Sequence, residues 1–216
     1  MPISTDAFKA AAQLAYGQLK TYFSQPPTEN VFWQCGHSFD TIVDYFANVD
    51  SSDANHFAPL ALTQYAPQIQ DWLDDYGWWG IAGLKAVRAG VFGPSYVASF
   101  HTDIIGPAWK KMADNAPYGW QRADQKTFKE WAPLIDGGVW NCVVDEKYHP
   151  GGTNQLGGRQ NTVTNGLYLV LGQRLSLAGD LPAGLAANRE YQFLTNWFAP
   201  PATLKLTPGQ ALMNYY

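Results

Sequence analysis

The chain has few charged residues and no basic run. Only 15% of its 216 residues are charged, well under the usual quarter or so. Its 14 basic and 18 acidic residues give a net charge of −4, and no cluster of cations is present that would displace counterions from a nucleic-acid backbone. The same balance argues against an anionic membrane surface. We therefore expect neither nucleic acid nor membrane among the partners.

Long apolar segments are also missing. The longest apolar stretches fall far short of the roughly 20 residues that a membrane-spanning helix needs. The N-terminus, Met1 to Asp6, lacks the basic region and apolar run of a signal peptide. Either the sequence is that of a mature or trimmed form, or the protein stays inside the cell, so the residues alone leave its localisation unknown.

Cysteine is scarce, and the histidines are scattered. Cys35 and Cys142 are too few and too far apart for a metal knuckle or a disulfide framework, and we expect two buried free thiols. The four histidines show no metal-ligand spacing. The glycine pairs at 151–152 and 157–158 are followed neither by Gly-Lys-Ser/Thr nor by a dinucleotide-binding pattern. We therefore expect no metal and no cofactor.

The hydrophobic spacing predicts an all-α fold of about seven helices. Apolar residues recur at helical intervals in segments that end at glycine or proline. These segments cover residues 6–23, 38–48, 57–69, 77–88, 95–112 with a break at Gly106-Pro107, 160–177 and 183–197. No linker is visible, so we expect a single domain over residues 1–216. Helix–loop–helix units of similar length suggest stacked hairpins, as in a toroid.

Aromatic residues are abundant, and several follow a pair of acids. They make up 15% of the chain, with nine Trp, and one segment reads Asp74-Asp75-Tyr76-Gly77-Trp78-Trp79. Two carboxylates can supply a general acid and a nucleophile, and glycoside hydrolysis with retention needs such a pair about 5–5.5 Å apart. The rings can supply flat surfaces for sugars. We take Asp74 and Asp75 as candidate catalytic residues.

A structural alternative exists for both parts of this segment. Asp74 or Asp75 can simply cap a helix, where acids also suit the helix dipole. Trp78 and Trp79 point about 100° apart on a helix, so they cannot both face one core. One of the two should line a cleft or lie at the surface near the acids, and Tyr76, Trp78 and Trp79 are therefore candidate substrate-binding residues.

A second polar cluster lies in the late loop and in the helix after it. The sequence reads Gly137-Gly138-Val139-Trp140-Asn141 and then Gln160-Asn161-Thr162-Val163-Thr164-Asn165. Two asparagines four residues apart share one helix face, and amides donate to and accept from sugar hydroxyls. The alternative is that these asparagines cap or bridge helices. The candidate substrate-binding residues here are Gly138, Trp140, Asn141, Gln160, Asn161 and Asn165.

Four segments together resemble glycoside hydrolase family 76, the α-1,6-mannanases. Residues 32–34 with 40–45 resemble the family's early helix, and residues 74–82 its catalytic Asp-Asp followed by a Trp pair. Residues 137–141 resemble its Gly-Gly-Ile-Trp-Trp loop, and residues 161–167 its Asn-Ala-Ile-Ser-Asn-Gly stretch. The segments keep the family's order and span most of the chain.

The resemblance implies an (α/α)6 toroid with the carboxylates in a central groove. It implies hydrolysis or transglycosylation of α-1,6-mannosidic linkages in mannan-type polysaccharide, with retention and without a metal. By position, Asp74 would be the nucleophile and Asp75 the general acid/base. It also suggests a secreted or cell-surface protein. The alternative is a non-catalytic glycan-binding or structural relative, since Asn141 stands where the family has a second Trp.

The candidate site carries two expectations. The side chains of Asp74, Asp75, Trp140 and Asn165 should converge on one groove. A retaining pair needs one carboxylate ionised and the other protonated, and two close acids push their titrations apart. We expect Asp75, as acid/base partner, to have the higher pKa.

The chain is short for a closed toroid. About seven helices cannot close a ring of six hairpins, so the first and last helices should expose apolar flanks. A contiguous apolar patch usually marks an interface. We therefore expect either self-association through the terminal helices or further sequence downstream in the natural protein. The candidate surface residues are Phe8, Leu14, Leu19, Leu185, Phe193, Leu194 and Trp197.

Overall fold

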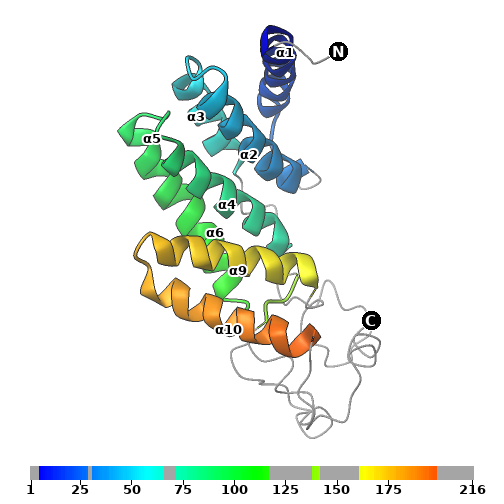
Figure 1. Ribbon diagram of the computed structural model, residues 1–216, viewed down its shortest axis with the longest axis vertical. Coiled ribbons are helices and arrows are strands. Elements are labelled where there is room, and N and C mark those ends of the chain that lie inside the picture. The colour runs from blue at the N-terminus through cyan, green and yellow to red at the C-terminus, as the bar shows by residue number, and fades with distance from the viewer. Residues whose placement is uncertain (1–4, 29–30, 66–71, 117–137, 142–160, 199–216) are drawn as a thin grey trace, which may run out of the picture. The chain divides into compact units, whose positions relative to one another are not determined.

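The structure, a computed structural model, describes residues 5–28, 31–65, 72–116, 138–141 and 161–198. These residues form seven helical segments and no strand (Figure 1), so the predicted all-α class is confirmed. The described residues belong to two compact units. Unit 1 takes in residues 1–70 and 78–108, and unit 2 takes in residues 71–77 and 109–216. The toroid and the single domain remain predictions.

Unit 1 contains the N-terminal helices and the greater part of α4. Its elements are α1 (Thr5–Phe23), α2 (Phe32–Asn48), α3 (Ala54–Gln64), α4 (Leu73–Ala89) from residue 78 onward, α5 (Pro94–Ser99) and the π-helical segment η3 (Phe100–Ile105). Their shared core is built of aromatic rings. Phe57, which is fully buried, lies 4.9 Å from Phe23 and 5.7 Å from Phe46 between ring centroids.

A single buried amide joins three helices of unit 1. The Gln64 side chain donates through Nε2 to the carbonyl oxygens of Phe23 and Gln25, and its Oε1 accepts from Cys35 Sγ at 3.6 Å. The polar atoms of this buried side chain are thus satisfied, as burial requires. Cys35 is a buried free thiol, as expected, whereas Cys142 lies outside the described residues.

Two helices begin four or more residues earlier than their sequences predict. α2 begins at Phe32 rather than Ser38, and α4 begins at Leu73 rather than Gly77. In both cases a glycine lies inside the helix, because a neighbouring element approaches too closely for a side chain. A Cβ at Gly36 would lie 3.1 Å from Trp78 Cβ, and one at Gly77 would lie 2.6 Å from Leu167 Cβ.

The predicted break at Gly106-Pro107 is wrong. The chain runs without interruption from α5 through η3 into α6 (Gly106–Ala113). Proline has no N–H and its ring clashes with the preceding turn of an α-helix. Here the turn before it is π-helical, with the Gly106 N–H donating to the carbonyl of His101, five residues back. This wider turn lets the helix continue through the proline.

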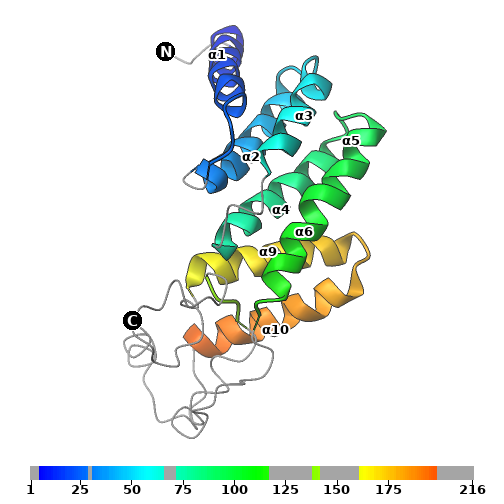
Figure 2. The ribbon, with the colours of Figure 1, turned by 180° about the vertical axis from the view of Figure 1, so that it is seen from behind.

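Unit 2 is built on two antiparallel helices, α9 (Thr162–Leu177) and α10 (Leu181–Phe198), which lie side by side in both views (Figures 1 and 2). Small residues let them approach closely: a Cβ at Gly172 would lie 3.0 Å from the Cβ of Ala187. The first turn of α4, the end of α6 and residues 138–141 belong to the same unit. α10 starts two residues before its predicted start because Asp180 Oδ1 accepts from the Ala183 N–H at 3.0 Å.

The terminal helices expose only part of the predicted apolar surface. Phe8 and Leu14 on α1 and Leu185 on α10 are exposed, and Leu19 and Leu194 are half-buried. Phe193 and Trp197 are buried, so their placement on an open edge was wrong; they belong to the apolar side of α10. Within the described residues, no helix is both long and apolar enough to cross a membrane.

Candidate active site

Asp74 and Asp75 lie in the first turn of α4, which starts one residue before them at Leu73. This position places them inside the helix rather than at its cap. The first turn of a helix carries backbone N–H groups without intrahelical partners, and its dipole favours negative charge there. Neither acid is the N-cap, but their first-turn position agrees with the other part of the structural alternative, in which acids suit the helix dipole.

The two carboxyl groups have different electrostatic environments. Asp75 is 5% exposed, and burial, together with the charge of Asp74, raises its pKa to about 7. Burial also raises the pKa of Asp74, but the backbone N–H groups of Asp74 and Asp75 act to lower it. Asp75 therefore keeps its proton to a higher pH than an ordinary carboxyl, as expected of an acid/base partner.

Asn165 on α9 holds the segment 138–141 in place. Its Oδ1 accepts from the Val139 N–H at 2.7 Å, and its Nδ2 donates to the Val139 carbonyl at 3.1 Å. The same Nδ2 donates to the carbonyl of Asn161 at 2.6 Å. The side chain is fully buried, so its assignment as a substrate-binding residue is corrected: Asn165 is a clamp on the backbone of Val139.

The clamped segment in turn contacts the start of α4. The carbonyl of Asn141 accepts from the Leu73 N–H at 2.8 Å, which satisfies one of the first N–H groups of the helix. A hydrogen-bonded path thus leads from Asn165 through residues 138–141 to the turn that carries Asp74 and Asp75. Gly138 is buried, whereas Trp140 and Asn141 are half-buried. A groove that joins these residues remains a prediction.

Asn161 has a structural role. It is the N-cap of α9, where its Oδ1 accepts from the Thr164 N–H at 2.7 Å. For both asparagines the structure thus supports the capping and bridging alternative. Gln160, the third amide of this group, lies outside the described residues.

The aromatic residues after the acid pair divide between core and surface. Tyr76 and Trp79 are fully buried, and Trp79 Nε1 donates to the Phe32 carbonyl at 2.8 Å within unit 1. Their assignment as sugar-stacking residues is corrected, because a ring without exposed surface cannot stack on a ligand. Trp78 is half-buried, with its ring 3.9 Å from that of His37. The two rings thus differ in burial, as expected, whereas a position of Trp78 near the acids remains a prediction.

Sequence reasoning missed a buried acid. Glu190 on α10 is fully buried, and within the described part of the chain both of its carboxyl oxygens lack a hydrogen-bond partner. Burial raises its pKa to about 9, so the side chain is neutral at neutral pH. Its position in phase with the buried Ala183, Ala187 and Trp197 was visible in the sequence as an acid on an apolar stripe.

The structure does not test the prediction that the protein needs no metal and no cofactor. Across the five described ranges, no group of three or more His, Cys, Asp or Glu residues is arranged to hold a metal ion. The expected absence of a metal and of a cofactor stays a prediction.

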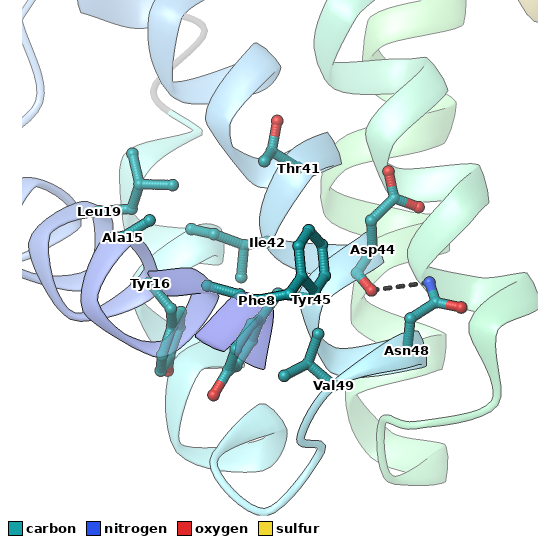
Figure 3. Close-up of a pocket in the computed structure, with 11 residues that line it drawn as sticks. Phe8, Ala15, Tyr16, Leu19, Thr41, Ile42, Asp44, Tyr45, Asn48 and Val49 are labelled. Atoms are coloured by element: carbon teal, nitrogen blue, oxygen red, sulfur yellow. Dashed lines mark hydrogen bonds between the residues drawn. The ribbon is translucent and has the colours of Figure 1, made fainter. Parts of the chain in front are cut away.

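A separate surface feature lies in unit 1, between α1 and α2. It is an open groove of about 420 Å³ with a mainly apolar lining. Figure 3 shows the side chains of both helices that face it, among them Phe8, Tyr16, Leu19, Ile42, Tyr45 and Val49. Asp44 and Asn48 add polar groups, joined by a hydrogen bond from Asn48 Nδ2 to the Asp44 carbonyl at 2.8 Å.

Fold and site together define an all-helical protein that carries two partly desolvated carboxyl groups in the first turn of one helix. A scan against protein-family models, a search of curated proteins and a search of solved structures each gave no match. The resemblance to family 76 therefore continues to depend on the four sequence segments alone.

Proposed function

We propose that this chain is a glycoside hydrolase that acts on α-1,6-mannosidic linkages of mannan-type polysaccharide. The observation that carries the proposal is the pair Asp74 and Asp75. Burial raises the pKa of both carboxyl groups, that of Asp75 to about 7, while backbone N–H groups oppose the rise at Asp74. Neighbouring carboxyl groups with separated titrations are what a retaining glycosidase requires.

In this mechanism the ionised Asp74 attacks the anomeric carbon while Asp75 gives its proton to the leaving glycosidic oxygen. The C–O bond of the linkage breaks, and a covalent glycosyl ester forms on Asp74. Asp75, now ionised, takes a proton from water as that water attacks the same carbon and releases the sugar. With a sugar hydroxyl in place of water, the second step is transglycosylation. No metal or cofactor takes part.

The second candidate is a non-catalytic glycan-binding or structural relative. The observation that favours it is that four of the predicted substrate-binding residues have structural roles. Tyr76, Trp79 and Asn165 are buried, and Asn161 caps α9. Trp78 and Trp140 retain exposed surface, which is enough for binding. The two candidates differ in turnover: the hydrolase releases product from mannan, and the non-catalytic relative does not.

The decisive experiment is incubation of the purified chain with α-1,6-linked mannan, followed by product analysis. Asp74→Asn and Asp75→Asn should each lower product formation by about 10²–10⁴-fold. The matched control is Asp114→Asn, which removes an exposed acid of unit 2 whose ion pair with Lys110 is worth little. Unchanged product formation in both site variants, or no product from the wild-type chain, would contradict the proposal.

We also propose that the chain self-associates through its terminal helices. The exposed Phe8 of α1, which lines the apolar groove, supports this proposal. The exposed Leu14 of α1 and Leu185 of α10 also support it. Light scattering should give a mass above that of one chain, and Phe8→Asp with Leu14→Asp should lower it. The control is Gln18→Asp on exposed surface of the same helix. A wild-type chain that is monomeric at high concentration contradicts the proposal.

A further inference from the structure

An open pocket of about 660 Å³ lies in unit 2 between the end of α6 and α10. Figure 2 shows these two helices from the side on which α6 lies in front. The lining includes Trp109 from α6 and three polar residues of α10, namely Asn188, Arg189 and Gln192. It contains none of the residues assigned to the carboxylate site.

Trp109 presents a rigid aromatic surface. Its ring stacks on the buried ring of Tyr168, with centroids 4.7 Å apart and planes 10° apart. The edge of the indole also packs against α9, where a Cβ on Gly172 would lie 3.2 Å from Trp109 Cη2. The side chain is half-buried, so the indole is held on one side and retains exposed surface. A ring that is already fixed loses little conformational entropy when a ligand binds.

The polar residues of α10 that line the pocket can form the hydrogen bonds by which proteins recognise sugars. Asn188 and Gln192 are one helical turn apart, with Arg189 between them on the same side of α10. Amides both donate and accept hydrogen bonds, and a guanidinium offers a fork of donors, which suits vicinal hydroxyl groups. Of the described residues that line the pocket, none is Asp or Glu. The described lining residues can therefore hold a sugar, and they supply no carboxyl group that would cleave it.

We propose that this pocket is a second glycan-binding site, which holds a sugar unit of the polysaccharide without cleaving it. The apolar face of the sugar ring lies on Trp109, and its hydroxyl groups bond to Asn188, Arg189 and Gln192. The identity of the sugar as mannose rests on the proposed function. A polymer that occupies this pocket is retained by the protein after each cleavage elsewhere along its length.

The test measures binding separately from turnover. In an Asp75→Asn background, which binds polymer without consuming it, affinity electrophoresis in gels containing α-1,6-mannan gives a dissociation constant. Trp109→Ala and the double variant Arg189→Ala, Gln192→Ala should each weaken retardation about tenfold or more. Gln173→Ala, on exposed surface of α9, is the matched control and should not change it. Because Arg189 and Gln192 are exposed, the double variant tests the pocket even if Trp109→Ala is unfolded.

The outcomes separate this inference from the proposed function. Retardation that depends on the pocket residues supports the second site, even if the wild-type chain releases no product from mannan. Equal retardation of the double variant and the control overturns the second site, even if the wild-type chain cleaves mannan. No retardation of the Asp75→Asn chain by mannan also overturns it.

Discussion

The two units differ in the kind of polar side chain that they bury. Unit 1 has an aromatic core, and its buried amide, Gln64, has partners for both its nitrogen and its oxygen. Unit 2 buries Asp75, Thr164, Asn165 and Glu190. Within the described ranges, Asp74 Oδ1, Thr164 Oγ1 and both oxygens of Glu190 have no hydrogen-bond partner. A buried polar group without a partner costs stability.

The difference supports the proposed location of the carboxylate site in unit 2. In unit 1 the burial of aromatic rings stabilises the fold, and the acid Asp53 is paired with Lys20 and Tyr16 at a partly exposed position. In unit 2 two carboxyl groups are deeply buried, and burial raises the pKa of Asp75 to about 7 and that of Glu190 to about 9. Strongly shifted carboxyl groups gather at functional sites more often than elsewhere, and here they gather in unit 2.

The largest expected effect is the pH dependence of turnover. Asp75 must be protonated for the first step, so kcat/KM should fall about tenfold per pH unit above about pH 7. A pH–rate profile on mannan measures this alkaline limb. Asp75→Glu should lower the rate but still show a fall in rate at alkaline pH. Asp53→Asn in unit 1 should leave the pH of that fall unchanged. A profile that stays flat well above neutral pH would contradict the assignment of Asp75.

The second prediction concerns Glu190. The folded chain keeps this proton up to about pH 9, whereas the unfolded chain releases it near the ordinary value of about 4.3. Between these values the folded state binds more protons, so the free energy of unfolding falls as pH rises. Glu190→Gln should therefore stabilise the protein, by about 1 kcal/mol more for each pH unit in this window.

Asp53 in unit 1 should change the free energy of unfolding with pH in the opposite direction to Glu190. Burial raises its pKa, but hydrogen bonds from Lys20 and Tyr16 outweigh this and lower it overall. Its contribution to stability is present above the unfolded pKa and is lost as pH falls through the folded one. Denaturant unfolding at several pH values should show Asp53→Asn destabilising and Glu190→Gln stabilising at neutral pH. The same sign in both variants would remove the contrast between the units.

The third prediction compares two buried amides, Asn165 in unit 2 and Gln64 in unit 1, by their effects on stability and on kcat. Asn165→Ala leaves the N–H and carbonyl of the buried Val139 without their partners, at a cost of about 1–3 kcal/mol. Because residues 138–141 contact the start of α4, turnover should fall as well. Gln64→Ala in unit 1 should cost a similar amount of stability without affecting kcat. Paired urea unfolding and kinetics check both variants, and an equal loss of kcat in the two would contradict the positioning role.

The smallest expected effect concerns glycines inside helices. Gly77→Ala should destabilise the protein by about 1–3 kcal/mol, because the new Cβ would meet Leu167. Gly166→Ala and Gly17→Ala have nothing within 4 Å and should each stabilise it by up to about 1 kcal/mol. Thermal unfolding of the three variants measures the differences. Stabilisation by Gly77→Ala would show that α4 and α9 approach less closely than the structure indicates.

The sequence by itself determined the helical class and the location of the acid pair. Apolar residues at helical spacing are a local property, so α1, α9 and α10 lie within two residues of their predicted bounds. The angle between successive side chains on a helix is also local, which is why the division between Trp78 and Trp79 followed from their adjacency. Asp74 and Asp75 are conspicuous in the sequence because two adjacent acids are followed directly by aromatic residues.

Only the tertiary structure decided which polar side chains remain available to a ligand. Asn165 has the same chemistry whether it faces solvent or the backbone of Val139, and the choice depends on a segment 26 residues away. The true starts of α2 and α4 were hidden for the same reason. Gly36 and Gly77 disfavour a helix by themselves, and only the structure shows that each lies inside a helix where Trp78 or Leu167 packs in the place of a side chain. Contacts between segments that are distant along the chain produce no repeating residue pattern, so a single sequence does not reveal them.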